Sequence, residues 1–336
     1  PLRLRPISPL SPPPLRQLLL SIQLSEQDTQ HVSGNIQDGS TSLMPVKTNC
    51  FVAGRHLPTK RIRLSRCRFY VTLDGYVKPC LFHKIKPKKT EADMDPTAFV
   101  HALADHGIVL NDHQQDQFAA YYQYLISENE KMNLTGISAE GDVYLKHFYD
   151  SLTLGLVVPE LQSQPLSLCD VGAGAGFPSI PLKIAFPQLK ITIVDSLQKR
   201  IGFLERLTAR LELTDVQLFH DRAETFGAKK SPHRGQYDLV TARAVAALNV
   251  LAELCLPLAK QHGQFVAMKA AATPEELIAA KPAINLLGGK LVQDAALTLP
   301  ETGDTRHLLV IEKVKPTPNK YPRKPGMPNK QPLGGA

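Results

Sequence analysis

The sequence lacks several features that would place it at once in a known class. It has no tryptophan, and aromatic residues make up only 6% of its 336 residues. Its five cysteines include no CxxC pair, so their spacing fits neither a disulfide framework nor a usual zinc site. No apolar run approaches the roughly eighteen residues that a membrane span needs. These absences favour a cytoplasmic protein with reduced thiols, no metal and no membrane attachment.

The net charge is +8, but the basic residues are unevenly distributed. Residues 1–93 hold 15 Lys and Arg against 6 Asp and Glu, residues 94–315 hold 20 against 25, and residues 316–336 hold 4 against none. The middle of the chain is therefore mildly acidic, and both flanks are basic. A local patch or the tail would have to supply any contact with nucleic acid.

Composition and periodicity divide the chain into four segments. They are a poorly ordered or non-native extension at 1–93, a helical lead-in at 94–160, the main domain at 161–315 and a basic, Pro-rich tail at 316–336. The extension begins proline-rich and has poor periodicity, apart from a candidate strand at 68–73 before the turn pair Asp74-Gly75. Met94 is a credible natural start. We expect the tail to be disordered when free.

The main domain alternates between strand and helix patterns. The expected strands are 166–171, 190–195, 216–220, 237–242 and 264–269, the expected helices are 178–186, 198–211 and 248–259, and a closing antiparallel pair is expected at 289–297 and 307–315. Strands that alternate with helices form a mostly parallel sheet that is covered on both faces. The sequence therefore predicts an α/β fold.

The stretch LCDVGAGAGF at 168–177 is the most informative part of the sequence. A buried strand runs here into three glycines, which permit positive φ angles and a close approach of the backbone to a ligand. In such sheets, ligands bind at the carboxyl ends of the strands. The dinucleotide template G-x-G-x-x-G would need glycine where Phe177 stands. The run G-x-G-x-G after Asp170 instead favours S-adenosylmethionine, which has no pyrophosphate.

Acidic residues follow the next two expected strands. Asp195 ends strand 190–195, where a carboxylate can accept hydrogen bonds from both hydroxyls of a ribose. Asp221 and Glu224 follow strand 216–220, where the adenine ring would lie. A single acidic residue at a strand end is more often a solvated cap. The glycine run and these acids occur together in the right order and spacing, and they predict an adenosylmethionine pocket.

Several motifs resemble the RsmG (formerly GidB) family of 16S rRNA guanine-N7 methyltransferases. They are DVGAGAGFP at 170–178, DSLQKR at 195–200, RAE at 222–224, TARA at 241–244, NLT at 133–135, HFYDS at 147–151, GDTRH at 303–307 and KYPRKPG at 320–326. The match covers roughly residues 96–333, and residues 1–93 have no counterpart. The resemblance implies that residues 161–315 form a Rossmann-like class I methyltransferase sheet, mostly parallel with an antiparallel terminal strand, preceded by a small helical segment.

The resemblance and the motifs together define a set of candidate site residues. The resemblance implies adenosylmethionine contacts by Gly172, Phe177, Ala223, Glu224 and Arg243, and the strand-end argument adds Gly174, Gly176 and Asp195. Arg243 ends the fourth strand, where its planar guanidinium can position substrate or cofactor. Lys199, Arg200 and Arg306 are candidates for contacts with RNA phosphates, although a solvated helix face explains Lys199 and Arg200 nearly as well.

The chemistry that the resemblance implies needs little from the protein beyond positioning. Guanine N7 has a free lone pair and no proton, so an in-line displacement at this atom requires no general base. The expected partner is 16S rRNA, in the small ribosomal subunit or its precursor, and the expected state is a monomer. The guanine N7 assignment rests on resemblance alone. Two alternatives stay open: a nicotinamide or flavin oxidoreductase, and a non-catalytic nucleic-acid-binding protein with a vestigial pocket.

Overall fold

The computed structural model describes residues 70–73, 76–79, 94–243, 246–270 and 274–334. The chain divides into two compact units, residues 1–85 and 86–336, which we treat separately. In the first unit, β1 (Tyr70–Leu73) pairs antiparallel with β2 (Tyr76–Pro79). The strand expected at 68–73 is therefore confirmed over its described part. The turn pair Asp74-Gly75 and the remainder of the predicted extension lie outside the described residues.

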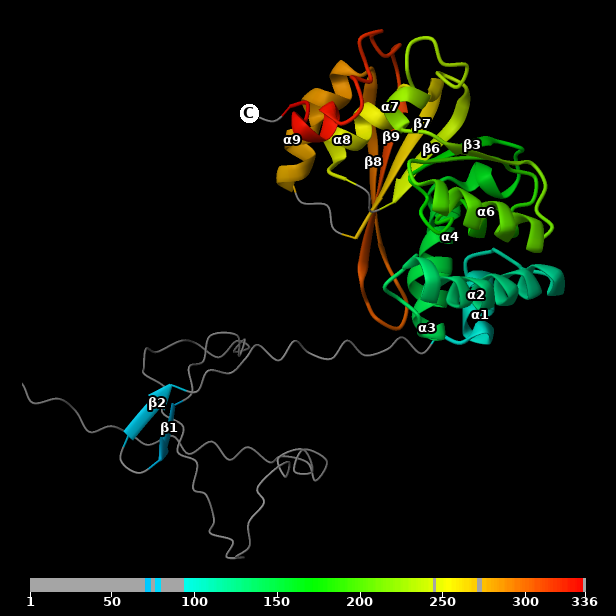
Figure 1. The fold of residues 1–336 in the computed structure, drawn as a ribbon, viewed down its shortest axis with the longest axis vertical. Helices are drawn as coiled ribbons and strands as arrows, with labels where there is room; N and C mark the ends of the chain where they lie inside the picture. Colours follow the sequence, from blue (N-terminus) through cyan, green and yellow to red (C-terminus); the bar gives the residue numbers. More distant parts are fainter. Residues whose placement is uncertain (1–69, 74–75, 80–93, 244–245, 271–273, 335–336) are drawn as a thin grey trace, which may run out of the picture. The chain divides into compact units, whose positions relative to one another are not determined.

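The second unit contains a seven-stranded sheet with the order β5-β4-β3-β6-β7-β9-β8 (Figure 1). Its strands are β3 (Ser167–Val171), β4 (Lys190–Asp195), β5 (Val216–His220), β6 (Tyr237–Arg243), β7 (Ala259–Lys269), β8 (Gly289–Thr298) and β9 (Thr305–Lys313). β3 to β7 are parallel, and β9 lies antiparallel between β7 and β8. The predicted α/β sheet with an antiparallel terminal strand is confirmed. Successive strands are added on one side of β3 as far as β5, and from β6 onward they are added on its other side. The loop after β3 therefore lies at the topological switch point of the sheet.

Two hydrophobic cores form because adjacent residues of each strand point to opposite faces of the sheet. Leu168 belongs to one core and Cys169 to the other. The first core packs against α4 (Asp150–Val157), α5 (Ser179–Ala185) and α6 (Gln198–Arg210), and the second against α7 (Ala223–Phe226), α8 (Leu248–Cys255) and α9 (Pro274–Leu286). With both faces covered, the parallel strands are apolar nearly throughout, which explains the continuous apolar runs in the sequence.

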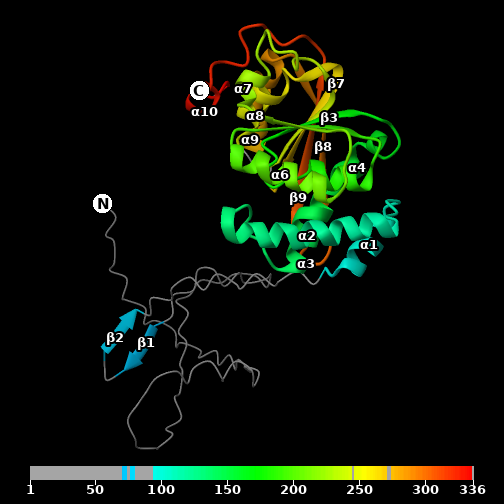
Figure 2. The same cartoon turned by 45° about the vertical axis from the view of Figure 1, so that its right-hand side comes forward.

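The helical segment before the sheet packs directly onto its helices. It comprises α1 (Pro96–Ala104), α2 (Asp112–Met132), α3 (Glu140–Val143), the π-helical turn η2 (Tyr144–Tyr149), α4 and the short helix η3 (Pro159–Gln162). Gln114 of α2 donates from Nε2 to the carbonyl of Ile184 at 2.7 Å, and Gln117 donates to that of Leu211 at 2.7 Å. These bonds fix α2 against α5 and the C-terminal end of α6, and Figure 2 shows α2 beneath α6.

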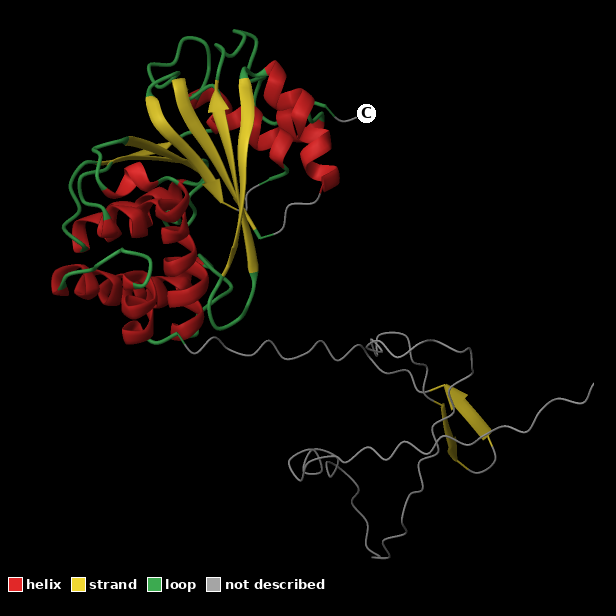
Figure 3. Cartoon of the chain, turned by 180° about the vertical axis from the view of Figure 1, so that it is seen from behind, coloured by secondary structure: helices red, strands yellow, loops and turns green. Residues whose placement is uncertain are grey.

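Residues 316–334 pack against the body of the protein, so the expectation of a disordered tail is wrong for this part. Tyr321 is buried, and Arg234 donates to the carbonyls of Thr317 and Tyr321 at 2.9 and 2.8 Å. A short helix, α10 (Met327–Lys330), contacts α8, and Figure 3 shows the C-terminal end beside the helices on this face. The segment is ordered because other parts of the chain supply partners for its backbone.

Candidate cofactor and substrate site

The glycine-rich loop after β3 has room for a ligand at one glycine but not at another. Gly172, Gly174 and Gly176 all have positive φ, at +77°, +62° and +101°. A Cβ atom on Gly174 would meet nothing within 4 Å, whereas one on Gly176 would lie 2.7 Å from Ile180 Cγ1 and 2.9 Å from Tyr121 Oη. Gly176 therefore permits close packing beneath the loop, and Gly174 leaves space above it.

Asp195 points into this loop from the end of β4. Its Oδ2 accepts from the Gly174 N–H at 3.2 Å, and its Oδ1 accepts from the Leu197 N–H at 2.9 Å. Arg200, one of the predicted RNA contacts, lies 3.3 Å from Oδ2 through Nη1. The structure thus brings the predicted acid and the glycine run together, and it also gives Arg200 a partner within the cofactor site.

Asp170 supplies an independent test of whether the site fits adenosylmethionine. Its carboxylate is fully buried at the end of β3, and Oδ2 accepts from the Ser179 N–H at 3.2 Å. Among the described residues, Asp170 Oδ1 and Ser179 Oγ make no hydrogen bond of normal geometry, although the Ser179 hydroxyl lies close enough to lower the pKa of Asp170 in part. Burial raises the pKa of Asp170 to about 7. Because a buried acceptor without a partner is costly, this site fits a ligand that brings a hydrogen-bond donor, such as the ammonium group of adenosylmethionine.

Phe177 packs into a stack of aromatic and cationic groups. Its ring lies 5.4 Å from that of Tyr121 and 4.5 Å from that of His147, both nearly parallel to it. The guanidinium carbon of Arg243 lies 4.9 Å from the same ring centroid, within range of a cation–π interaction. Tyr121 also donates to the Ala175 carbonyl at 2.5 Å. The helical lead-in therefore supports the glycine loop, a role that the sequence did not indicate for Tyr121.

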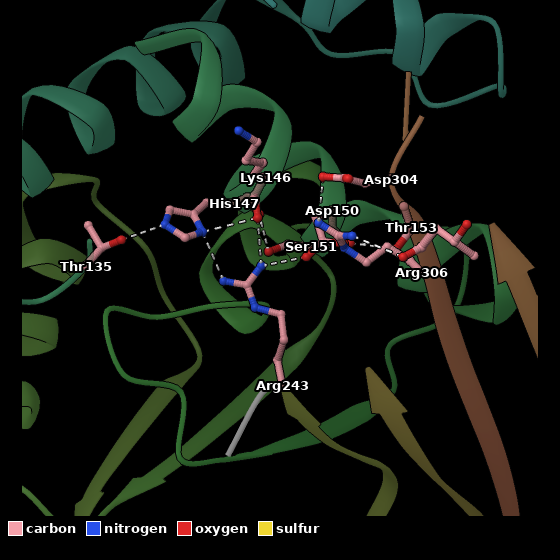
Figure 4. A network of polar contacts seen from close by, with 10 residues as sticks. Thr135, Lys146, His147, Asp150, Ser151, Thr153, Arg243, Asp304 and Arg306 are labelled. Carbon is pink, nitrogen blue, oxygen red and sulfur yellow. Dashed lines mark hydrogen bonds and ion pairs between the residues drawn. The ribbon is translucent and has the colours of Figure 1, made fainter. Parts of the chain in front are cut away.

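Arg243 joins the end of β6 to the helical lead-in (Figure 4). Its Nη1 donates to Asp150 Oδ2 at 3.0 Å and to the Lys146 carbonyl at 3.3 Å, and its Nη2 lies 3.4 Å from His147 Nδ1. On the other side, Arg306 Nε donates to Asp150 Oδ1 at 2.9 Å. The side chains of the three charged residues are 8 to 15% exposed, so this is a largely buried network rather than a surface ion pair.

His147 is held neutral within this network. Its Nε2 lies 2.8 Å from Thr135 Oγ1, which belongs to another motif of the sequence. Burial, together with the neighbouring charge of Arg243, lowers the pKa of His147 to about 3. His147 and Asp150, three positions apart in the sequence, both contact Arg243. The π-helical turn η2 carries His147, and such turns occur frequently at functional sites.

A pocket of about 200 Å³ opens beside the network. Its lining residues are Lys146, His147, Asp150, Arg243, Met268, Lys269, Ala270, Arg306 and Leu308. We call it the Arg243 pocket. A larger cavity of about 270 Å³ lies at the amino end of β6, around Asp238 and Lys260, away from the glycine loop. The Arg243 pocket adjoins the carboxyl ends of β6 and β7, where sheets of this kind bind ligands, so it is a candidate substrate site.

Comparisons with known proteins identify the family. The family model for rRNA small subunit methyltransferase G (GidB) matches residues 114–308. The ribosomal RNA small subunit methyltransferase G of Lacticaseibacillus paracasei is 90% identical over 243 residues, which is 72% of this chain and 100% of that protein. The protein of the same name from Limosilactobacillus reuteri is 61% identical over 240 residues, 71% of this chain and 100% of that protein. The chain belongs to the rRNA small subunit methyltransferase G family.

Membership in the methyltransferase G family confirms the resemblance and the enzyme class. The chain is an adenosylmethionine-dependent methyltransferase, and the oxidoreductase and non-catalytic alternatives are not favoured. Among the described residues, no group of three or more His, Cys, Asp or Glu could hold a metal ion. No helix in the described part of the chain is long and apolar enough to cross a membrane.

The remaining residues that the sequence predicts to contact the cofactor or RNA lie in three different parts of the structure. Ala223 begins α7, and Glu224 accepts from the Gly326 N–H at 2.8 Å and lies 3.4 Å from Arg222 Nη2. The tail therefore contacts Glu224, one of the residues that the sequence predicts to bind the cofactor. Lys199 is exposed, with Nζ 3.3 Å from the Met132 carbonyl. Because Arg200 and Arg306 each pair with a buried aspartate, the three predicted RNA contacts do not form one patch of free cations.

Proposed function

We propose that this protein transfers the methyl group of adenosylmethionine to N7 of a guanine in 16S rRNA, within the small ribosomal subunit or its precursor. The observation that carries the proposal is the position of Arg243. Its guanidinium lies over Phe177 of the glycine loop and also lines the Arg243 pocket. A single side chain therefore touches both the expected cofactor site and the candidate acceptor site.

The cofactor would supply an electrophilic methyl group on a sulfonium. On the protein side, Gly174 leaves room for it, and Asp170 Oδ1 can accept a hydrogen bond from its ammonium group. Asp195 lies beside Gly174, where its carboxylate can orient the ribose. The carboxylate of Glu224 is engaged by the tail, so we assign the adenine contact to the backbone at Ala223 and Glu224.

The Arg243 pocket suits an acceptor that needs orientation but no proton removal. Met268 and Leu308 provide apolar walls, and guanidinium groups can donate hydrogen bonds to guanine O6. A neutral His147 and a paired Asp150 supply no free base, as expected for attack by the unprotonated N7. Asp150 also offsets the positive charges of Arg243 and Arg306. This lowers the electrostatic repulsion that a purine would meet when it becomes cationic on methylation.

The proposal includes a monomer that acts in the cytoplasm, with Lys199, Arg200 and Arg306 as candidate phosphate contacts. Lys199 is the most accessible of the three. Arg200 and Arg306 would have to share their aspartate partners with RNA. Size-exclusion chromatography with light scattering tests the monomer independently of the reaction.

The reaction is tested with purified protein, labelled adenosylmethionine and small-subunit particles that lack the modification. The expected product is one methylated guanine whose methyl group mass spectrometry places on N7. Arg243→Ala should abolish transfer, and Arg210→Ala, on the exposed face of α6, should not. A methyl group on an exocyclic amine, or none on rRNA, would contradict the proposal.

A further inference from the structure

The packed tail, residues 316–334, is held to the protein by a buried ion pair. Glu253 of α8 is fully buried, and both its oxygens accept from the Arg323 guanidinium, with Nη2 to Oε2 at 2.6 Å and Nε to Oε1 at 2.9 Å. The Arg323 backbone N–H also donates to Oε1 at 2.8 Å. This carboxylate therefore fixes both the side chain and the backbone of the tail.

Two further contacts fix the segment on either side of Arg323. Arg234 donates to the carbonyls of Thr317 and Tyr321, and the Gly326 N–H donates to Glu224. Glu224 lies on α7, which directly follows β5. Because the carboxyl end of β5 belongs to the edge of the sheet that holds the cofactor loop, Gly326 lies beside that edge. Thr317 and Tyr321 instead contact Arg234, which precedes the amino end of β6, so the tail runs along this face of the sheet from one edge toward the other.

The outer side of the tail carries cations without acidic neighbours in its own sequence. Lys320, Lys324 and Lys330 are exposed, and residues 316–336 contain no Asp or Glu. Arg222, just before α7, and Lys229 and Lys230, just after it, are exposed as well, and of these Arg222 is paired with Glu224. The two acids that the tail contacts, Glu224 and Glu253, are buried and already accept its hydrogen bonds. The exposed lysines of the tail therefore present positive charge that neither of these two acids neutralises.

We propose that residues 316–334 form a preassembled platform that binds the phosphate backbone of RNA along the face of the sheet covered by α7 and α8, and that this platform reaches the cofactor edge at Gly326. The inference rests on the proposed function, since it names a surface through which that enzyme would hold its substrate. The rest of the second unit has an acidic excess, so RNA needs a local basic surface to bind. A platform that is already packed loses less conformational entropy on binding than a free basic tail does.

The test uses the full chain and a transcript of the small-subunit rRNA as the probe. Lys320→Glu with Lys324→Glu removes two exposed cations and leaves Arg323 and its ion pair in place. The matched control, Lys190→Glu with Lys290→Glu, changes the net charge equally at exposed positions outside the tail. We expect the tail variant to bind RNA at least about tenfold more weakly and to lower the slope of log K against log salt by about 2. Affinity for adenosylmethionine should not change.

The outcomes separate this inference from the proposed function. If both double variants bind RNA like the unchanged protein, or both lose the same affinity and slope, the platform is wrong even though methyl transfer proceeds. If the tail variant alone loses affinity while the unchanged protein methylates no guanine, the platform stands and the proposed reaction fails. Thermal unfolding of both variants checks that the loss does not come from a damaged fold.

Discussion

The carboxylate of Asp150 holds the guanidinium of Arg243, with Oδ2 3.0 Å from Nη1. Its other oxygen holds Arg306 Nε at 2.9 Å. Asp150 begins α4, Arg243 ends β6 and Arg306 lies on β9, so one carboxylate links three segments that are far apart in the chain. Each arginine is oriented by a group outside its own strand, and this orientation directs Arg243 toward both Phe177 and the Arg243 pocket.

Asp150→Asn should therefore damage catalysis through Arg243. The amide can accept at only one position, so Arg243 would lose its fixed orientation, and a displacement of about 1 Å can lower a rate about 100-fold. We expect kcat for methyl transfer to fall by about this factor, with a smaller change in the Kd for adenosylmethionine. The control is Asp304→Asn, since Asp304 lies 4.0 Å from Arg306 and is 40% exposed. Equal losses in both variants would contradict the positioning role.

Two of the three glycines in the loop, Gly174 and Gly176, should respond differently to substitution by alanine. Gly174→Ala places a methyl group in open space, so the free energy of unfolding falls only by the strain of an alanine at positive φ, about 1 to 2 kcal/mol. The same methyl group takes up space that the cofactor would occupy. Gly176→Ala collides with Ile180 and Tyr121, and we expect about 3 kcal/mol or more of lost stability. Calorimetric titration with adenosylmethionine and urea unfolding distinguish the two effects. A Gly174→Ala protein that binds the cofactor normally would exclude this location for it.

The local elements of the fold could be predicted because their signals lie within a few residues of each other. The centre of β4 is apolar and β-branched, β5 mixes apolar and polar residues, and the observed bounds of both strands match the expected ones. Helix α9 was missed, since Pro282 interrupts its pattern and the residues around it are small. Its burial depends on α8 and β8, which no local pattern reveals.

The site was predictable only in part, for the same reason. Asp195 and the glycine run are separated by one βα unit, and the fold alone brings them together. The contact of Arg243 with Asp150 joins residues 93 positions apart, and that of Arg323 with Glu253 joins residues 70 apart. Such partners follow from the packing of whole segments, so Arg306 and the tail looked like free cations in the sequence.

The raised pKa of Asp170 predicts a specific dependence of stability on pH. Burial raises this pKa to about 7, against about 3.9 in an unfolded chain, so the native state keeps a proton that the unfolded state has lost. The proton on Asp170 therefore stabilises the native state fully below pH 4, and this contribution is lost as the pH rises to about 7. The free energy of unfolding should fall by about 4 kcal/mol at most over this range. Urea unfolding between pH 4 and 8 should show this decline in the unchanged protein. In Asp170→Asn this component should be missing, and an identical profile would contradict the assignment.

The same group predicts how cofactor affinity changes with pH. A cationic ligand next to Asp170 favours the ionised carboxylate, so affinity for adenosylmethionine should increase as the pH rises through about 7. The measurement is calorimetric titration at pH 5.5 and pH 7, where the α-amino group of the ligand, with an ordinary pKa of about 7.7 to 8, stays mostly protonated and His147 stays neutral because its pKa is about 3. Asp170→Asn should bind with similar affinity at both values. A pH-independent affinity in the unchanged protein would place the ammonium group elsewhere.

Removal of the Arg323 side chain should release the tail and destabilise the protein, because the carboxylate of Glu253 would be left buried without a partner. Arg323→Ala leaves the carboxylate of Glu253 buried without its counter-ion, and breaking such a pair costs about 3 to 5 kcal/mol. We expect a lower free energy of unfolding and rapid tryptic cleavage after Lys320 and Lys330 under native conditions. Arg323→Met with Glu253→Leu removes both charges, so stability should largely recover, because apolar side chains of similar size can replace a buried ion pair. If Arg323→Ala alone left stability and cleavage unchanged, the ion pair would not anchor the tail, since a buried carboxylate cannot lose its partner without cost.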